Sequence, residues 1–166
     1  MAATALDAQP APDGFVRLVA ATRLHSDPDR VVAVLDRGDR PLGGERLTHP
    51  DGRDLRRVAI DLRLRVGGEA AGLTTLGKAA YLDLGRPRRT ADGWELEIGW
   101  QASTAAPLFP VFAGWLSIGR SELRIDGFYA PPGGVIGRVA DRMLLHVAAN
   151  GTARWLLNEI DRAAAD

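Results

Sequence analysis

The chain has 166 residues, which is enough for one domain built around a single hydrophobic core. Its 21 basic residues balance its 21 acidic residues, so no overall charge draws it to nucleic acid or to an anionic membrane. The absence of cysteine excludes a disulfide framework, a thiolate zinc site and a cysteine nucleophile.

Residues 1–14 are expected to form a flexible leader. They are rich in alanine, proline and aspartate, and they lack the basic start and apolar core of a secretion signal. The longest purely aliphatic run, residues 31–35, is far shorter than a membrane-spanning segment. We therefore expect residues 15–166 to form one domain of a cytoplasmic protein without stable membrane insertion.

Alternation in residues 15–24 predicts a half-buried first strand, with Val16, Leu18, Ala20 and Leu24 on one face. Ser26, Asp27 and Pro28 then offer a capping oxygen and a proline in the first helical turn. They predict a short helix over 28–36 that ends near Gly38, and we interpret Ser26 as its cap. Residues 39–54 are rich in glycine, proline and charge, so we expect a loop there, with or without one irregular helical turn.

Residues 55–66 show the clearest alternation in the chain and predict a strand with one core face and one solvent face. Its expected core residues are Val58, Ile60, Leu62, Leu64 and Val66. Residues 73–77 are ambiguous, and residues 79–84 are expected to form the next strand. Residues 86–93 are typical of a polar turn that closes at Asp92-Gly93.

Residues 94–101 place two tryptophans on one strand face, which predicts a wall of the core; the face holds Trp94, Leu96, Ile98 and Trp100. Strand pairing is expected to stop at the prolines of 105–110 and to resume over 111–118. Phe112 and Trp115 differ by three positions, so either one of them faces outward or the strand bulges near Pro110. The strand over 122–130 has an inward face of Leu123, Ile125, Gly127 and Tyr129. About six strands, mostly linked as hairpins, precede the last helix.

A helical pattern of about thirty residues without proline follows the Pro-Pro-Gly-Gly of 131–134. Its first apolar stripe holds Ile136, Ala140, Met143 and Val147, and beyond Asn150-Gly151 the apolar set becomes Trp155, Leu156 and Ile160. This change predicts two separate contacts, with Gly151 at a bend or a close backbone approach. Asn150 and Arg154 are the polar residues expected to face the interior. A helix this long needs a broad partner surface, so we predict an α+β fold: a curved antiparallel β-sheet wrapped around a long C-terminal helix, with one or two short helices after the first strand.

Several motifs in this order resemble bacterial members of the START-like superfamily, the helix-grip proteins also called SRPBCC or polyketide cyclase/dehydrase and lipid-transport proteins. The motifs are WQA at 100–102, FP at 109–110, GFYAPPGGVIG at 127–137 and DRMLLHVA at 141–148. The resemblance covers residues 15–165. It implies an apolar cavity between sheet and helix that in many relatives holds a lipid, hormone, polyketide or other hydrophobe. Such proteins usually carry two short helices after the first strand, whereas this sequence predicts one. No catalytic motif is common to the superfamily, so none is carried over.

We expect the ligand to be a hydrophobic small molecule and its contacts to be Trp100, Phe112, Trp115, Tyr129, Met143, Val147, Asn150 and Arg154. The same side chains could instead fill a solid core, since ligand sites and cores are both mostly apolar. No cofactor or metal is expected, because His25, His49 and His146 sit in unrelated segments without ligand spacing. The glycines of 133–137 do not have the spacing of a dinucleotide loop.

Two other functions stay open at this stage. An enzyme could use the same cavity for cyclisation or dehydration, with Tyr129 and His146 moving protons. An interaction module could use an arginine-bearing face for RNA or a partner protein, the residues being Arg53, Arg56, Arg57, Arg63, Arg65, Arg86, Arg88 and Arg89. Aromatic residues are not interleaved with these arginines in the sequence, which favours a solvated sheet face over a nucleic-acid platform.

Overall fold

The computed structural model describes residues 11–38, 42–49, 51–66, 74–103, 111–130 and 139–165; within these ranges the side chains of 61–66, 74–78, 102 and 139–148 are not described. The elements are β1 (Val16–Arg23), α1 (Pro28–Arg37), β2 (Glu45–Thr48), β3 (Asp54–Val66), β4 (Thr74–Leu84), β5 (Arg88–Arg89), β6 (Trp94–Ala102), β7 (Val111–Ile118), β8 (Glu122–Ala130) and α2 (Val139–Ala165).

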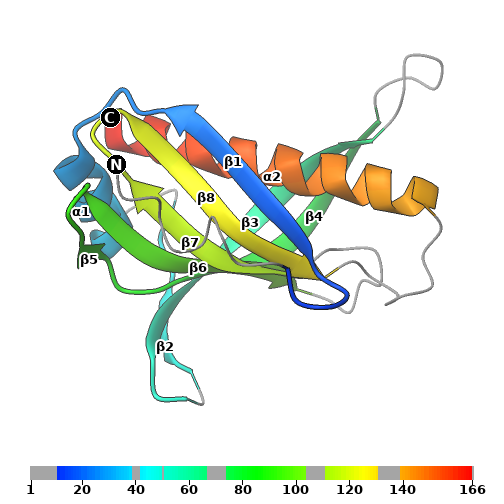
Figure 1. Cartoon of the computed structure of the whole chain (residues 1–166). Coiled ribbons are helices and arrows are strands. Elements are labelled where there is room, and N and C mark those ends of the chain that lie inside the picture. The colour runs from blue at the N-terminus through cyan, green and yellow to red at the C-terminus, as the bar shows by residue number, and fades with distance from the viewer. Residues whose placement is uncertain are drawn as a thin grey trace.

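The strands form one antiparallel sheet in the order β1-β8-β7-β6-β4-β3-β2, with β5 paired to β6. Helix α2 contacts β1 at one edge and β3 near the other edge, so the sheet must curve around the helix. Figure 1 shows α2 running across this sheet and ending beside α1. The predicted fold, a curved antiparallel sheet around a C-terminal helix with one short helix after the first strand, is confirmed.

The predicted strand faces form the core. Leu18, Leu96, Ile98, Leu123 and Ile125 are all buried on the concave side, as their alternation required. The second contact of α2 is also confirmed; its fully buried residues are Ala149, Ala153, Leu156, Leu157, Ile160 and Ala164. One face of the C-terminal half of α2 is therefore packed against the core. The expected core side chains Leu62, Leu64 and Val66, and the first helix stripe, lie outside the described residues.

The N-cap of helix α1 is Asp27, one residue after the predicted cap Ser26. Asp27 is the N-cap, because its side chain accepts a hydrogen bond from the Asp29 backbone N–H at 2.8 Å. Ser26, the predicted cap, instead donates its hydroxyl to the backbone carbonyl of Asp161 in α2, at 3.2 Å. Gly38 ends the helix in the left-handed conformation, at φ 70°, as predicted.

The sheet has more strands than the sequence predicted, because two edge strands carry no apolar alternation. Strand β2 lies in the expected loop and pairs Leu47 with Leu55 of β3, although most of its side chains are exposed. Strand β5 lies in the expected polar turn and pairs Arg88 with Glu95 of β6. Strand β4 begins at Thr74 and takes in the ambiguous segment. Edge pairing uses backbone groups, so side-chain patterning does not reveal it.

Gly151 does not mark a close backbone approach. It is exposed within the continuous helix α2, and no atom lies within 4 Å of the position that an added Cβ would occupy. We expect Gly151→Ala to raise the free energy of unfolding by about 1 kcal/mol, since alanine favours an exposed helix interior over glycine by that amount. The midpoint of thermal unfolding should rise by roughly 2–4 °C for a domain of this size. A lowered midpoint would contradict this placement.

Asp126 of β8 is a buried carboxylate that ties β1 to β8. Arg17 reaches it with hydrogen bonds of 3.1 and 2.9 Å, and Arg124 donates a third at 2.9 Å. Burial alone would raise the pKa of Asp126, but the hydrogen bonds from both guanidinium groups outweigh burial and lower it.

The lowered pKa of Asp126 predicts how stability depends on pH. Its contribution is complete above the unfolded pKa of about 3.9 and is lost as the pH falls through the lower folded value. Asp126→Asn should therefore cost about 1–2 kcal/mol at pH 7. Urea unfolding of both proteins should show this gap shrinking as the pH falls below about 4. A gap that is constant over that range would show that the ionised carboxylate does not stabilise the β1–β8 pair.

Candidate functional site

Three aromatic side chains form a row across the concave face of the sheet. Trp100 of β6 lies opposite Phe112 of β7, Phe112 lies opposite Tyr129 of β8, and Tyr129 lies opposite Val16 of β1. The rings of Trp100 and Phe112 stack with centroids 3.9 Å apart and an interplanar angle of 15°. All three are 1–2% exposed. We call Trp100, Phe112 and Tyr129 the aromatic row.

A pair of glycines makes room for the aromatic row. Gly114 and Gly127 lie opposite each other on β7 and β8, and a Cβ added to either would come within 2.8 Å of the Phe112 ring tip. The backbone is closer still: a Cβ on Gly114 would lie 2.4 Å from the Asp126 carbonyl oxygen, and one on Gly127 would lie 2.4 Å from that of Ala113. Only residues without a side chain let the Phe112 ring lie along these strands. The inward position of Gly127 was predicted, but its pairing with Gly114 required the register.

The aromatic row lies toward the N-terminal half of α2. At the end of β1, the Thr22 hydroxyl bonds to Asn158 of α2 at 3.1 Å. Val16, which lies opposite Tyr129, is six residues before Thr22 on β1, a distance of about 20 Å along the strand. The same distance along α2 is about thirteen residues, counted from Asn158 toward the start of the helix. Figure 1 shows the same arrangement, with the start of β1 and the end of β8 on the side where α2 begins. Met143 and Val147 belong to this half of α2, and their side chains lie outside the described residues.

Trp100 carries a buried polar atom without a partner. Its indole Nε1–H is buried and has no hydrogen-bond acceptor among the described residues. An unpaired buried donor costs about 1–3 kcal/mol, so such groups are uncommon in native proteins. Burial raises the pKa of Tyr129, which keeps its phenol protonated and uncharged at neutral pH.

The structure corrects the position of two expected ligand contacts. Trp115 lies on the convex face of the sheet, where the Arg88 guanidinium stacks 4.5 Å from its ring, while Phe112 takes the inward place. Strand alternation is therefore regular here, and the two residues face opposite sides. Arg154 is exposed, because Ala153, on the neighbouring position of α2, faces the core instead. Asn150 is half-buried.

The convex face of the sheet has a hollow of its own, with a volume of about 530 Å³. Its lining includes Gly99, Ala113, Trp115 and Phe128 together with the loop between β2 and β3. A further hollow of about 600 Å³ lies among α1, β2, β3 and β4. Trp100 and Phe112 of the aromatic row also line the convex hollow, together with Gly114 and Gly127, whereas Tyr129 lines neither of these two hollows.

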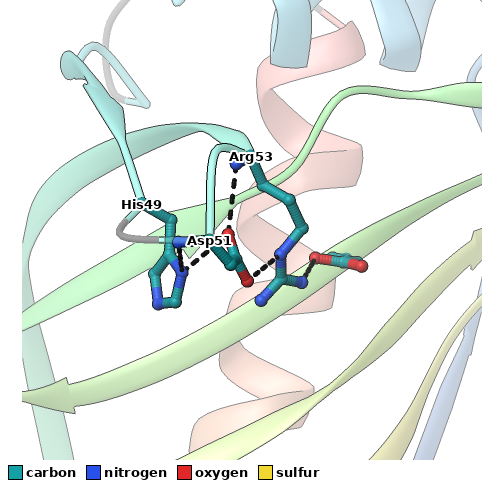
Figure 2. Close-up of polar contacts among 4 residues, drawn as sticks. His49, Asp51 and Arg53 are labelled. Atoms are coloured by element: carbon teal, nitrogen blue, oxygen red, sulfur yellow. Dashed lines mark hydrogen bonds and ion pairs between the residues drawn. The ribbon is translucent and has the colours of Figure 1, made fainter.

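An ion-pair network closes the β2–β3 loop over the convex hollow (Figure 2). Asp51 contacts His49 Nδ1 at 2.8 Å and Arg53 Nε at 2.6 Å, and Arg53 also pairs with Glu97 of β6. Desolvation opposes ionisation of Asp51, but hydrogen bonds from the Arg53 backbone, His49 and the Arg53 guanidinium outweigh it and lower the pKa of Asp51 to about 2. The network anchors the β2–β3 loop to Glu97 of β6.

Several convex-face arginines with described side chains are paired with carboxylates, whereas the side chains of Arg63 and Arg65 lie outside the described residues. Arg57 binds Asp83 at 2.7 and 2.8 Å, and Arg88 binds Glu95 at 2.6 Å. Arg57 and Arg88 also stack on the rings of Tyr81 and Trp115, contacts that we did not expect because the partners come from different strands. Paired arginines release few counterions from a nucleic acid, so this face does not favour the RNA hypothesis.

The remaining expectations concern metals, membranes and histidines. No group of three histidine, aspartate or glutamate residues that could hold a metal ion occurs in the part of the chain that the structure describes. Within those same residues, no helix combines the length and the apolar character that a membrane span requires. His25 bonds to Asp161 at 2.8 Å, whereas His146 and the glycines of 133–137 lie outside the described residues.

The arrangement of sheet and helix defines the class of the protein as a helix-grip α+β domain. A scan of protein-family models and a search of curated proteins both find no match to the chain. Among solved structures, it is similar to a STAR-related lipid transfer protein from Xanthomonas axonopodis, with 15% identity, a TM-score of 0.37 and coverage of 92% of this chain and 96% of that one. At such a low sequence identity and TM-score, nothing about the ligand or activity of this protein follows from the similarity.

Proposed function

We propose that the protein binds or carries a hydrophobic small molecule or lipid between the aromatic row and the N-terminal half of α2. The observation that carries this proposal is the aromatic row itself. Its flat apolar surface lies on the concave side and is made possible by Gly114 and Gly127, where an added Cβ would force the neighbouring backbone to shift. The motifs that resemble START-like proteins support the same assignment, and we propose membership of that superfamily on those motifs.

Apolar burial supplies enough free energy for such a ligand. Each methylene removed from water contributes about 0.8 kcal/mol, so a chain of ten contributes roughly 8 kcal/mol before the entropic cost of association. Aromatic faces add contact area at little cost in side-chain entropy, because Trp, Phe and Tyr have few rotatable bonds. Met143 and Val147 would close the site from α2, and the half-buried Asn150 would lie at its inner end.

Native mass spectrometry of the purified protein, with and without a lipid extract, tests this proposal. We expect a one-to-one adduct with an apolar molecule. The chain offers a matched pair of variants, because Trp100 and Trp115 lie on neighbouring strands but on opposite faces of the sheet. Trp100→Leu should weaken the adduct, and Trp115→Leu should retain it, provided circular dichroism shows both variants folded. A protein that stays ligand-free in the extract would refute the proposal.

A further inference from the structure

The buried indole N–H of Trp100 points to the chemistry of the ligand. We infer that the site takes an apolar molecule carrying an uncharged hydrogen-bond acceptor, such as the carbonyl oxygen of a ketone or ester, and that Trp100 Nε1 donates to it. This inference rests on the proposed function, and it adds the polar group by which the ligand is recognised.

Among the described residues, no group uses the Trp100 indole N–H as a hydrogen-bond donor. Trp100 is 2% exposed, its ring stacks on Phe112, and its Nε1–H finds no acceptor among the described residues. Trp94, which lies on the same face of the same strand, offers a contrast, because it donates its indole N–H to Asp29 at 2.7 Å. An indole can only donate, so the partner that satisfies Trp100 must be an acceptor.

The charges around the aromatic row favour an uncharged acceptor. Glu95 and Asp126 are the buried charged residues among those described, and both are already paired with arginines. Among residues with described side chains, the arginines whose strand positions face the concave side are Arg46, Arg56 and Arg89. Arg56 donates to the Asp36 carbonyl at the end of α1 at 2.9 Å, and Arg89 pairs with Asp29 of α1 at 2.9 Å. The described neighbours of Trp100 on the adjacent strands are Leu82 and Phe112, so a carboxylate or phosphate beside Trp100 would lose its hydration without gaining a cation from these positions. A ketone or ester loses less and gains one hydrogen bond.

Displacement of the uncharged dye Nile red by three matched probes tests the inference: undecane, 2-undecanone and undecanoate. We expect the ketone to bind wild-type protein roughly 5- to 30-fold more tightly than the alkane, the factor expected when a buried donor gains its acceptor. Trp100→Phe keeps an aromatic ring and removes the N–H, so it should bring this ratio close to one while changing alkane binding less than threefold. Trp115→Phe, the control on the convex face, should leave the ratio unchanged.

The outcomes separate the two proposals. Equal binding of ketone and alkane to wild-type protein would overturn the inference and leave the proposed function standing. Tighter binding of undecanoate than of the ketone would overturn the inference that the acceptor is uncharged. Failure of Nile red and all three probes to bind would overturn both proposals.

A spectroscopic measurement on wild-type protein keeps the test valid if Trp100→Phe does not fold. The indole N–H proton resonance of Trp100, assigned by elimination with phenylalanine variants of Trp94, Trp115 and Trp155, should move downfield with 2-undecanone and not with undecane. An unchanged resonance at saturating ketone would overturn the inference.

Discussion

Replacing Gly127 with alanine is expected to lower the free energy of unfolding by about 2–3 kcal/mol, the range for overpacking a close-packed core. The new Cβ would lie 2.4 Å from the Ala113 carbonyl oxygen and 2.5 Å from the Gly114 Cα, and both are backbone atoms that cannot rotate away. The strand pair would have to separate, which would also displace the Phe112 ring. Urea denaturation at pH 7 measures the change.

Gly151→Ala is the matched control for this experiment, because the same substitution is expected to stabilise the exposed helix. Gly114→Ala should behave like Gly127→Ala, since its Cβ would meet the Asp126 carbonyl oxygen at 2.4 Å. A loss below about 0.5 kcal/mol for both strand variants would mean that the close approach of β7 and β8 is not required, because such a loss is within the range of ordinary surface substitutions.

Replacing Phe112 with alanine is expected to have the largest effect on stability, a loss of about 3–5 kcal/mol. The ring is 2% exposed, stacks on Trp100 and covers the two glycines, so its removal leaves a cavity bordered by backbone that cannot collapse easily. Chemical denaturation followed by near-ultraviolet circular dichroism would report both the stability and the environment of Trp100.

Phe128→Ala provides the comparison for Phe112→Ala. Phe128 lies on the convex face and is only half-buried, so less apolar area leaves water when the protein folds. We expect its replacement to cost less than half as much as that of Phe112. Equal costs for the two variants would contradict the placement of the aromatic row at the centre of the concave face.

The fold could be predicted because the central strands bury one face each. In β6 and β8 the inward residues alternate without interruption, and the structure places them as expected, from Leu96 to Trp100 and from Leu123 to Tyr129. Strands β2 and β5 escaped prediction because backbone hydrogen bonds hold them to the sheet and their side chains are largely exposed. The cap of α1 was misplaced by one residue because Ser26 and Asp27 are both good capping residues.

The site depended on register, which a single sequence does not contain. The alternation rule left open whether one of Phe112 and Trp115 faces outward or the strand bulges near Pro110. The pairing of β6 with β7 showed a regular strand in which Phe112 meets Trp100. The pairing of Gly114 with Gly127 likewise became evident only from the register of β7 and β8. Arg154 was misplaced because the helical pattern offered Ala153 and Arg154 as neighbours, and the smaller apolar residue took the buried position.

Photo-crosslinking with a diazirine-bearing long-chain ketone tests the location of the ligand most directly. If the concave side opposite the start of α2 holds the ligand, the label should appear on Phe112, Tyr129 or residues 139–148, and excess 2-undecanone should suppress it. Label confined to the convex hollow around Ala113 and Trp115, or label that excess ketone does not suppress, would contradict a ligand site beneath the helix.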